Sequence, residues 1–309
     1  MIKNDNIKNI SMNSLSLFNE GQIAESVASV ANNLIDKISA ATGWVFSPKG
    51  LKFAQEEANK KLIDEISERT DICVFERSKL ISMLVEFSKK KENIITILAD
   101  SFDHLKNDAN PQNISDDWII DFIDKASKIS DVGMQKLWSN LIADEANRPN
   151  SFSKKLLHVL FVMSYEDAEN FLNLTRFCFY DSTEDHHLHP IIFLKKHPKS
   201  YQKSRITHQI LNEMENLGLI ECDYTVGFIF DNSKDLYYQN KKIRIEGKKI
   251  DAGNVRLSSL GQMLAKLSDK QNHTAILDFT IDNWSRLGCN VQVMRRDKLC
   301  QIKYKSKSP

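Results

Sequence analysis

The chain has 309 residues, with 42 Lys and Arg against 41 Asp and Glu, and 41% of its residues are hydrophobic. This apolar fraction is enough for a packed core and excludes wholesale disorder, while 10 Gly and 6 Pro exclude a collagen-like or low-complexity chain. At roughly 100–200 residues per domain, the length predicts two domains, or one domain with a long extension. No apolar run reaches the roughly 18 residues of a membrane span, and no secretory signal precedes the first helical pattern.

Cysteine usage and charge predict the compartment and the kind of partner. The five cysteines are scattered, odd in number and never form a C-x-x-C pair, which predicts a reducing compartment without disulfides or a cysteine zinc site. We therefore expect a soluble, cytoplasmic protein. Residues 191–309 hold 21 Lys and Arg against 12 Asp and Glu, a net charge of +9, and residues 1–190 hold 21 against 29, a net charge of −8. An acidic half joined to a basic half concerns partners rather than fold.

The N-terminal half reads as helices. Residues 1–20 are polar and predict a flexible N-terminus, whereas the apolar residues of 23–41 recur every three or four positions and predict a helix. A second helix follows Ser47-Pro48 and runs to about Arg69. A third covers residues 71–106. One face of it carries Phe75, Leu80, Met83, Leu84 and Phe87.

Four shorter helices are expected between residues 115 and 174. Ser115-Asp116-Asp117 and Ser130-Asp131 are typical N-caps of the first two. The third covers residues 153–163, and the fourth opens at Ser164 with a pattern like a capping box. Together with residues 21–114 they predict one helical domain over 21–175.

After residue 175 the pattern becomes mixed and predicts an α+β domain over 190–309. A helix over 203–217 ends at Gly218, and strands, a helix over 258–268 and a short helix over 281–287 follow it. The expected strands cover residues 219–223, 226–230, 236–238, 243–245, 275–279, 291–294 and 301–304. A helix, a glycine and then two or three strands outline a winged helix, so the fold class is mainly α with a C-terminal, winged-helix-like α+β part.

The most distinctive stretch runs from Trp118 to Leu160. It contains Ser-Asp at 130–131, Met-Gln at 134–135, Leu-Trp at 137–138, and the pattern Pro149 to Ser153. This stretch resembles the core motif of the bacterial domain of unknown function 2806 family, with Asp144 and Asn150 where that family usually has Gly. The matching positions that we single out are Trp118, Ser130, Asp131, Met134, Gln135, Trp138, Glu145, Pro149, Ser151 and Phe152.

Weaker matches at both ends extend this resemblance over most of the chain. The central helices are also similar to the abortive-infection alpha family. That similarity implies a bacterial or prophage host and a link to defence against phage. It implies no reaction and no catalytic residues.

The basic C-terminal half is the site expected for nucleic acid. In a winged helix, the start of the 203–217 helix would enter a groove of the nucleic acid. The candidate wing, which holds Lys241, Lys242 and Arg244, would place its basic side chains on phosphates. The candidate residues are Lys203, Arg205, His208, Gln209, Lys241, Lys242 and Arg244. The alternative is a solvated basic face that docks on acidic protein.

A metal site is the weaker hypothesis. His186, His187 and His189 lie in a predicted loop together with two carboxylates, and imidazole with carboxylate suits zinc or manganese. Solvated loop histidines explain the same pattern. A membrane role for residues 23–46 is disfavoured because the polar face carries Glu25 and Asp36.

No nucleophile elbow, metalloprotease, P-loop or dinucleotide motif is present, so we expect no cofactor and lean against an enzyme. Three hypotheses stay open. The first is a non-enzymatic interaction protein that meets a protein partner or a second copy and acts in anti-phage defence. The second is a nucleic-acid-binding protein. The third is a metal-dependent hydrolase or nuclease.

Overall fold

The structure is a computed structural model that describes residues 25–44, 51–181, 187–194, 201, 204–267 and 274–295. The predicted flexible N-terminus, His186, Lys203 and the expected strand at 301–304 lie outside these residues. The chain divides into two compact units, Met1–Tyr165 and Glu166–Pro309, and each is described by itself. The last of the predicted helices, residues 165–175, falls almost wholly in the second unit. The limits 21–175 and 190–309 remain a prediction.

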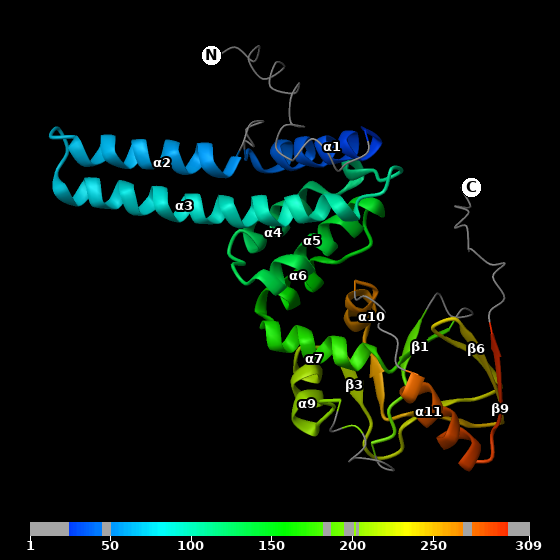
Figure 1. Cartoon of the computed structure of the whole chain (residues 1–309). Helices are drawn as coiled ribbons and strands as arrows, with labels where there is room; N and C mark the ends of the chain where they lie inside the picture. Colours follow the sequence, from blue (N-terminus) through cyan, green and yellow to red (C-terminus); the bar gives the residue numbers. More distant parts are fainter. Residues whose placement is uncertain are drawn as a thin grey trace. The chain divides into compact units, whose positions relative to one another are not determined.

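The first unit is helical throughout its described part (Figure 1). Two long helices form a hairpin, and shorter helices pack beside one half of it. Its elements are α1 (Glu25–Thr42), α2 (Leu51–Glu68), α3 (Val74–Ser101), the 3-10 turns η3 (Phe102–His104) and η4 (Pro111–Asn113), α4 (Asp116–Ala126), α5 (Val132–Asn147) and α6 (Lys154–Val162).

Local side-chain chemistry sets where these helices begin. The Asp131 carboxylate accepts the N–H of Met134 at 2.9 Å, and so caps α5 as its sequence predicted. Ser153 caps α6 in the same way. Ser115 precedes α4 but makes no side-chain cap bond there. At the start of α3, Cys73 and Glu76 form a reciprocal capping box.

The first helix packs on the unit rather than presenting its apolar face outward. Leu34 and Ile38 of α1 are fully buried, and α1 lies against α4. Lys37 of α1 forms an ion pair with Asp116 of α4. Packing therefore accounts for the apolar stripe of this helix. Within the described residues, none of the helices is both long enough and apolar enough to cross a membrane.

The second unit combines helices with antiparallel sheets. The largest sheet has five strands in the order β2-β1-β5-β6-β9, and the pairs β3-β8 and β4-β7 form two smaller sheets. Its elements are α7 (Tyr165–Thr175), β1 (Cys178–Asp181), β2 (Leu188–Pro190), α9 (His208–Asn216), β3 (Ile220–Cys222), β4 (Phe228–Phe230), β5 (Lys234–Tyr238), β6 (Lys241–Glu246), β7 (Ile250–Gly253), β8 (Val255–Leu257), α10 (Ser259–Lys266), α11 (Thr274–Arg286) and β9 (Asn290–Arg295).

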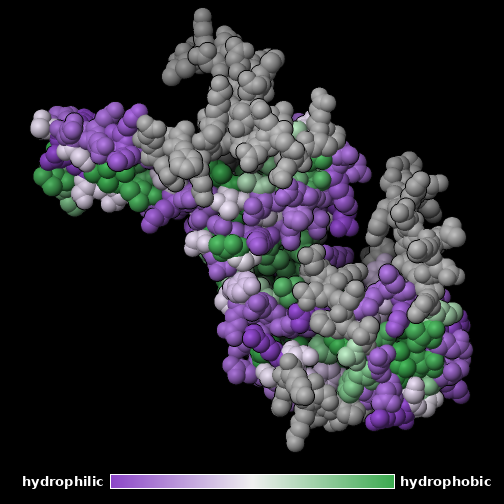
Figure 2. Space-filling model, in the orientation of Figure 1, coloured by the Kyte–Doolittle hydropathy of each residue, from purple (hydrophilic) through white to green (hydrophobic). Residues whose placement is uncertain are grey.

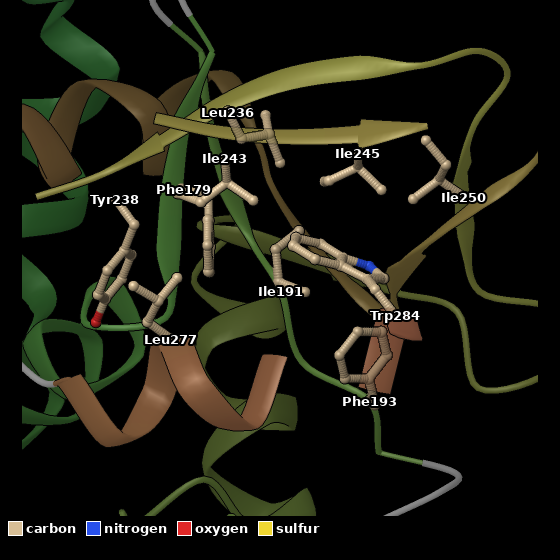
Figure 3. Close-up of a cluster of buried hydrophobic side chains, with 10 residues drawn as sticks. All are labelled: Phe179, Ile191, Phe193, Leu236, Tyr238, Ile243, Ile245, Ile250, Leu277 and Trp284. Atoms are coloured by element: carbon tan, nitrogen blue, oxygen red, sulfur yellow. The ribbon is translucent and has the colours of Figure 1, made fainter. Parts of the chain in front are cut away.

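The core of the second unit lies between α11 and one face of the five-stranded sheet (Figure 3). Leu277 and Trp284 of α11 face the sheet residues Phe179, Leu236 and Ile243. The Trp284 indole N–H donates to the carbonyl of Asp251 at 2.8 Å, so its polar edge is also satisfied. This contact anchors the helix to the chain that follows β6.

The fold class expected from the sequence is confirmed, because the described chain is mainly helical with an α+β C-terminal part. The strand expected at 275–279 is wrong, since residues 274–286 form the single helix α11. Ile276 and Phe279 pack against the core beside Leu277, and this burial makes a helical face look like a short strand.

The winged-helix arrangement is not confirmed. The hairpin β5–β6, which contains the candidate wing, pairs with β1 on one side and β9 on the other. The strand that follows α9 is β3, and it pairs with β8 instead. Gly218 adopts φ 70° after α9, as expected of a residue that ends a helix.

Candidate protein-interaction site

The hairpin of α2 and α3 exposes apolar side chains over half its length. All the buried residues of α3 lie in its second half, namely Ile94, Ile97, Leu98 and Ser101, where α3 packs against α5. Its first half, residues 74–90, contains no buried residue and packs against α2. A two-helix hairpin covers only one side of each helix, so the other sides of this half meet no further helix in the described chain.

The seam between α2 and α3 is identified by its partly buried residues. Arg77, Ile81, Leu84 and Ser88 of α3 recur every three or four positions and, together with Lys90, are the less exposed side chains of this half. The Asn59 amide of α2 donates to the Ser88 hydroxyl at 2.8 Å, and the Arg77 guanidinium donates to the carbonyl of Ser67 at 2.8 Å. These bonds set the register of the hairpin.

A second stripe of α3 lies beside this seam and is exposed to solvent. Leu80, Met83 and Phe87 are separated by three and four residues, and the same spacing continues through position 90 to Ile94 and Ile97. The stripe is fully buried at Ile94 and Ile97, but Met83 is 58% exposed and Phe87 is 51% exposed. The face that the unit covers at its C-terminal end is therefore uncovered along the hairpin, and Lys90 separates its two apolar parts. We call Leu80, Met83 and Phe87 the hairpin stripe.

The surface agrees with this description. Figure 2 shows apolar residues gathered on the α3 side of the hairpin, while the visible side of α2 is hydrophilic. Trp44, which follows α1, stacks on Phe87 with 5.4 Å between ring centroids, yet half of Phe87 stays exposed. Among the described residues, seven of the eighteen large exposed apolar side chains belong to this hairpin. They are Leu62, Val74, Phe75, Leu80, Met83, Val85 and Phe87.

Two of the three candidate basic residues of the β5–β6 hairpin, Lys242 and Arg244, are paired with carboxylates. The Lys242 ammonium lies 2.8 Å from the Asp235 carboxylate, and this bond raises the pKa of Lys242. Arg244 lies 4.0 Å from Asp235 and 3.4 Å from Glu246. Lys241 begins β6 and is partly buried. The carboxylates offset much of the field that would attract a phosphate backbone.

The candidate residues at and before the start of α9 also contact neighbouring side chains. Arg205 adopts φ 58° and lies 3.7 Å from the Glu169 carboxylate. His208 packs its ring 5.2 Å from that of Tyr224, and the Gln209 amide donates to Glu213 within α9. The candidate helix and the candidate wing lie on elements of different sheets, because α9 packs on β3.

A buried ion pair between Asp181 and Lys234 lies next to the histidine stretch. Asp181 at the end of β1 is fully buried, 2.6 Å from the Lys234 ammonium and 3.8 Å from His189 Nε2. His187 and His189 lie with their ring centroids 6.1 Å apart. In the described residues, His, Cys, Asp and Glu side chains form no group of three that could hold a metal ion.

Residues of the family motif form the core of the first unit. Trp118, Met134, Trp138 and Phe152 are buried, and the ring centroids of Trp118 and Trp138 lie 5.3 and 5.4 Å from that of Phe122. Ser130 is exposed next to the Asp131 cap, and Pro149 and Ser151 are partly buried in the turn after α5.

The two polar motif residues that are buried join backbone segments. Gln135 donates to the carbonyl of Ile129 at 2.9 Å and to Asn93 of α3 at 3.3 Å. The Glu145 carboxylate accepts the N–H groups of Asn150, Ser151 and Phe152 at 2.6, 3.1 and 3.0 Å. Burial raises the pKa of Glu145, and the three N–H donors oppose this shift. Both side chains thus hold the helices and the turn together.

Asn150 explains one departure from the family motif. Its φ is 67°, a left-handed conformation that Gly adopts freely and that Asn tolerates better than other residues. The turn that Glu145 binds therefore keeps its shape with Asn in place of Gly.

Sequence reasoning placed Phe75, Leu80, Met83, Leu84 and Phe87 on one helix face and did not identify that face as exposed. The structure places Leu84 in the seam with α2 instead. A signal was present, because the stripe continues past position 90 while the following helices α4, α5 and α6 span only 11, 16 and 9 residues. A 28-residue helix is too long for these neighbours to cover.

The comparison with protein families matches residues 82–278 to the model described as protein of unknown function (DUF2806). No curated protein and no solved structure matches the chain. The similarity of the central helices to the abortive-infection alpha family stays a prediction. Because the match covers well over half of the sequence, and because the buried motif residues of the first unit lie within it, the chain belongs to the DUF2806 family.

Proposed function

We propose that this protein acts through protein–protein contacts, in a non-enzymatic cytoplasmic role, with the hairpin stripe as its docking surface. The observation that carries the proposal is the exposure of Leu80, Met83 and Phe87 on a helix whose same face is buried at Ile94 and Ile97. Large apolar surfaces left on a soluble protein mark interaction sites. The cytoplasmic role is supported by the cysteines, since those in the described part of the chain form no disulfide.

The competing hypotheses have weaker support. Nucleic-acid binding is weakened by the pairing of Lys242, Arg244 and Arg205 with carboxylates. A metal-dependent hydrolase has less support, since no three His, Cys, Asp or Glu side chains of the described residues form a metal-ligating group. The family-motif residues contribute packing and hydrogen bonds to the backbone, and these roles suit a scaffold better than a reaction centre.

A photo-crosslinking amino acid at position 83 tests the proposal in bacterial cells that express the full chain. The matched control carries it at position 85, because Val85 is exposed and lies two residues away, about 200° around the helix. Protein adducts from position 83 and none from position 85 are the expected result. No adduct from position 83, or equal adducts from both positions, would overturn the proposal.

A role in defence against phage is the finer part of the proposal. It rests on the resemblance of the central helices to the abortive-infection alpha family. We expect that expression of the wild type lowers phage yield, that Met83→Glu abolishes this effect and that Val85→Glu retains it. An unchanged phage yield with the wild type would remove the defence role and leave the interaction role in place.

A further inference from the structure

From the hairpin stripe we infer that its occupant is a second copy of this chain, whose α3 lies antiparallel to the first. This inference rests on the proposed function, since it names the partner of the same surface. The two α3 helices would meet across a two-fold axis near Met83. Two hairpins would then form a four-helix arrangement that covers both stripes.

The sequence of charges along the stripe supports a second copy. Glu76 lies seven residues before Met83 and Lys90 lies seven residues after it, and both positions continue the spacing of the stripe. A rise of 1.5 Å per residue puts them about 21 Å apart along α3. In an antiparallel pair, Glu76 of each copy faces Lys90 of the other copy. Within one chain, Lys90 pairs with Glu86 at 2.6 Å and Glu76 caps α3, so this cross-pair adds to contacts that each side chain already makes. A parallel pair would set like charges opposite each other, which is unfavourable.

The rest of the hairpin has the same polarity. Near its loop, residues 64–79 contain five carboxylates (Asp64, Glu65, Glu68, Asp71, Glu76) and three basic residues (Arg69, Arg77, Lys79), for a net charge of −2. At its base, residues 55–61 and 86–92 contain five lysines and four glutamates, for a net charge of +1. An antiparallel second copy places each acidic end on a basic base.

The hairpin has internal hydrogen bonds that fix the surface it would present to a second copy. Its seam is set by the bonds from Asn59 to Ser88 and from Arg77 to Ser67. The side chains offered to the second copy include a methionine and an aromatic ring, which are enriched at the cores of protein interfaces. Trp44 against Phe87 adds a further ring at the base end of the stripe.

Light scattering on the purified full chain tests this inference. We expect a mass of twice the 35.5 kDa of one chain at tens of micromolar. Met83→Glu places a charge at the centre of the apolar contact and should weaken self-association at least about tenfold. Val85→Glu makes the same chemical change on another face and should retain the wild-type mass. Equal melting temperatures of the two variants exclude misfolding.

Orientation has its own readout. Under mild oxidation, Met83→Cys should form a disulfide between copies, because position 83 lies at the axis. The exposed Cys73, ten residues away, would lie about 30 Å from its equivalent in an antiparallel pair and should form none. Peptide mapping by mass spectrometry distinguishes these products. A disulfide between two copies of Cys73 would overturn the antiparallel arrangement.

A monomeric wild type at all concentrations would overturn the inference. Photo-crosslinking at position 83 then separates it from the proposed function. Adducts to the chain itself support both, and adducts to a different protein alone retain the proposed function and reject the second copy.

Discussion

The Asn59 amide of α2 donates a hydrogen bond to the Ser88 hydroxyl of α3 across 2.8 Å. The bond lies inside the seam of a two-helix hairpin that buries no residue completely between positions 59 and 93. A buried or partly buried polar pair in a helix seam specifies register, and the bond from Arg77 to Ser67 adds a second such contact. The position of the hairpin stripe relative to α2 therefore depends on these bonds.

Removal of the Asn59 amide should loosen the hairpin without unfolding the unit. We expect Asn59→Ala to destabilise the hairpin by about 1 kcal/mol, because the Ser88 hydroxyl loses the donor that joins it to α2 and keeps only its bond to the Leu84 carbonyl within α3. Hydrogen–deuterium exchange should become faster in residues 74–90 and stay unchanged in 94–101, which pack on α5. Equal acceleration in both segments would show that the hairpin does not open by itself.

Glu145 should be essential for stability rather than for activity. Glu145→Ala leaves the N–H groups of Asn150, Ser151 and Phe152 without their acceptor, and we expect a loss of about 2–4 kcal/mol in the free energy of unfolding. Glu145→Gln keeps one acceptor oxygen and should lose less. Urea denaturation measures both, with Asp144→Ala as the neighbouring control. A wild-type midpoint for Glu145→Ala would contradict the assigned role.

The pH dependence of stability follows from the same residue. Burial raises the pKa of Glu145 in the folded state above its ordinary value near 4.5, so the folded protein holds this proton more tightly than the unfolded chain. The resulting stabilisation is fully present below the ordinary pKa and is lost as pH rises through the raised pKa. The melting temperature of wild type minus that of Glu145→Gln should therefore increase as pH falls from 7 towards 4.5. A difference that shrinks over this range would contradict the direction of the shift.

The fold class and the first-unit helices could be predicted because their signals are local. The caps at Asp131 and Ser153 and the buried spacing of Trp118 and Phe122 act within a few residues. The sheet order could not be predicted, because β1 pairs with β5 across more than fifty residues. The strand prediction for residues 275–279 was wrong for a related reason. Short apolar runs look alike in helices and strands until the elements that they pack against are known.

The candidate site could be predicted from the sequence only in part. Sequence periodicity places Leu80, Met83 and Phe87 on one face, but exposure depends on how far α5 extends beside α3. The basic candidates show the opposite problem. Lys242 and Arg244 read as a charged patch until pairing of β5 with β6 brings Asp235 beside Arg244 and close to Lys242.

Lys242 and Arg244 should contribute little to nucleic-acid affinity. Their charges are already paired with Asp235 and Glu246, so Lys242→Ala and Arg244→Ala should change the affinity of the full chain for double-stranded DNA less than about threefold. Fluorescence anisotropy over a salt series measures this effect. A tenfold loss together with a shallower salt dependence would return these residues to the nucleic-acid hypothesis.

The most direct measurement of the central claim is the oxidation rate of Met83 as protein concentration rises. Met83 and Met294 are both exposed, at 58% and 41%, and only Met83 lies on the hairpin stripe. Mass spectrometry after brief treatment with hydrogen peroxide gives both rates in one sample. The account predicts that Met83 becomes protected at high concentration while Met294 does not. A Met83 rate that does not depend on concentration would contradict self-association through the stripe.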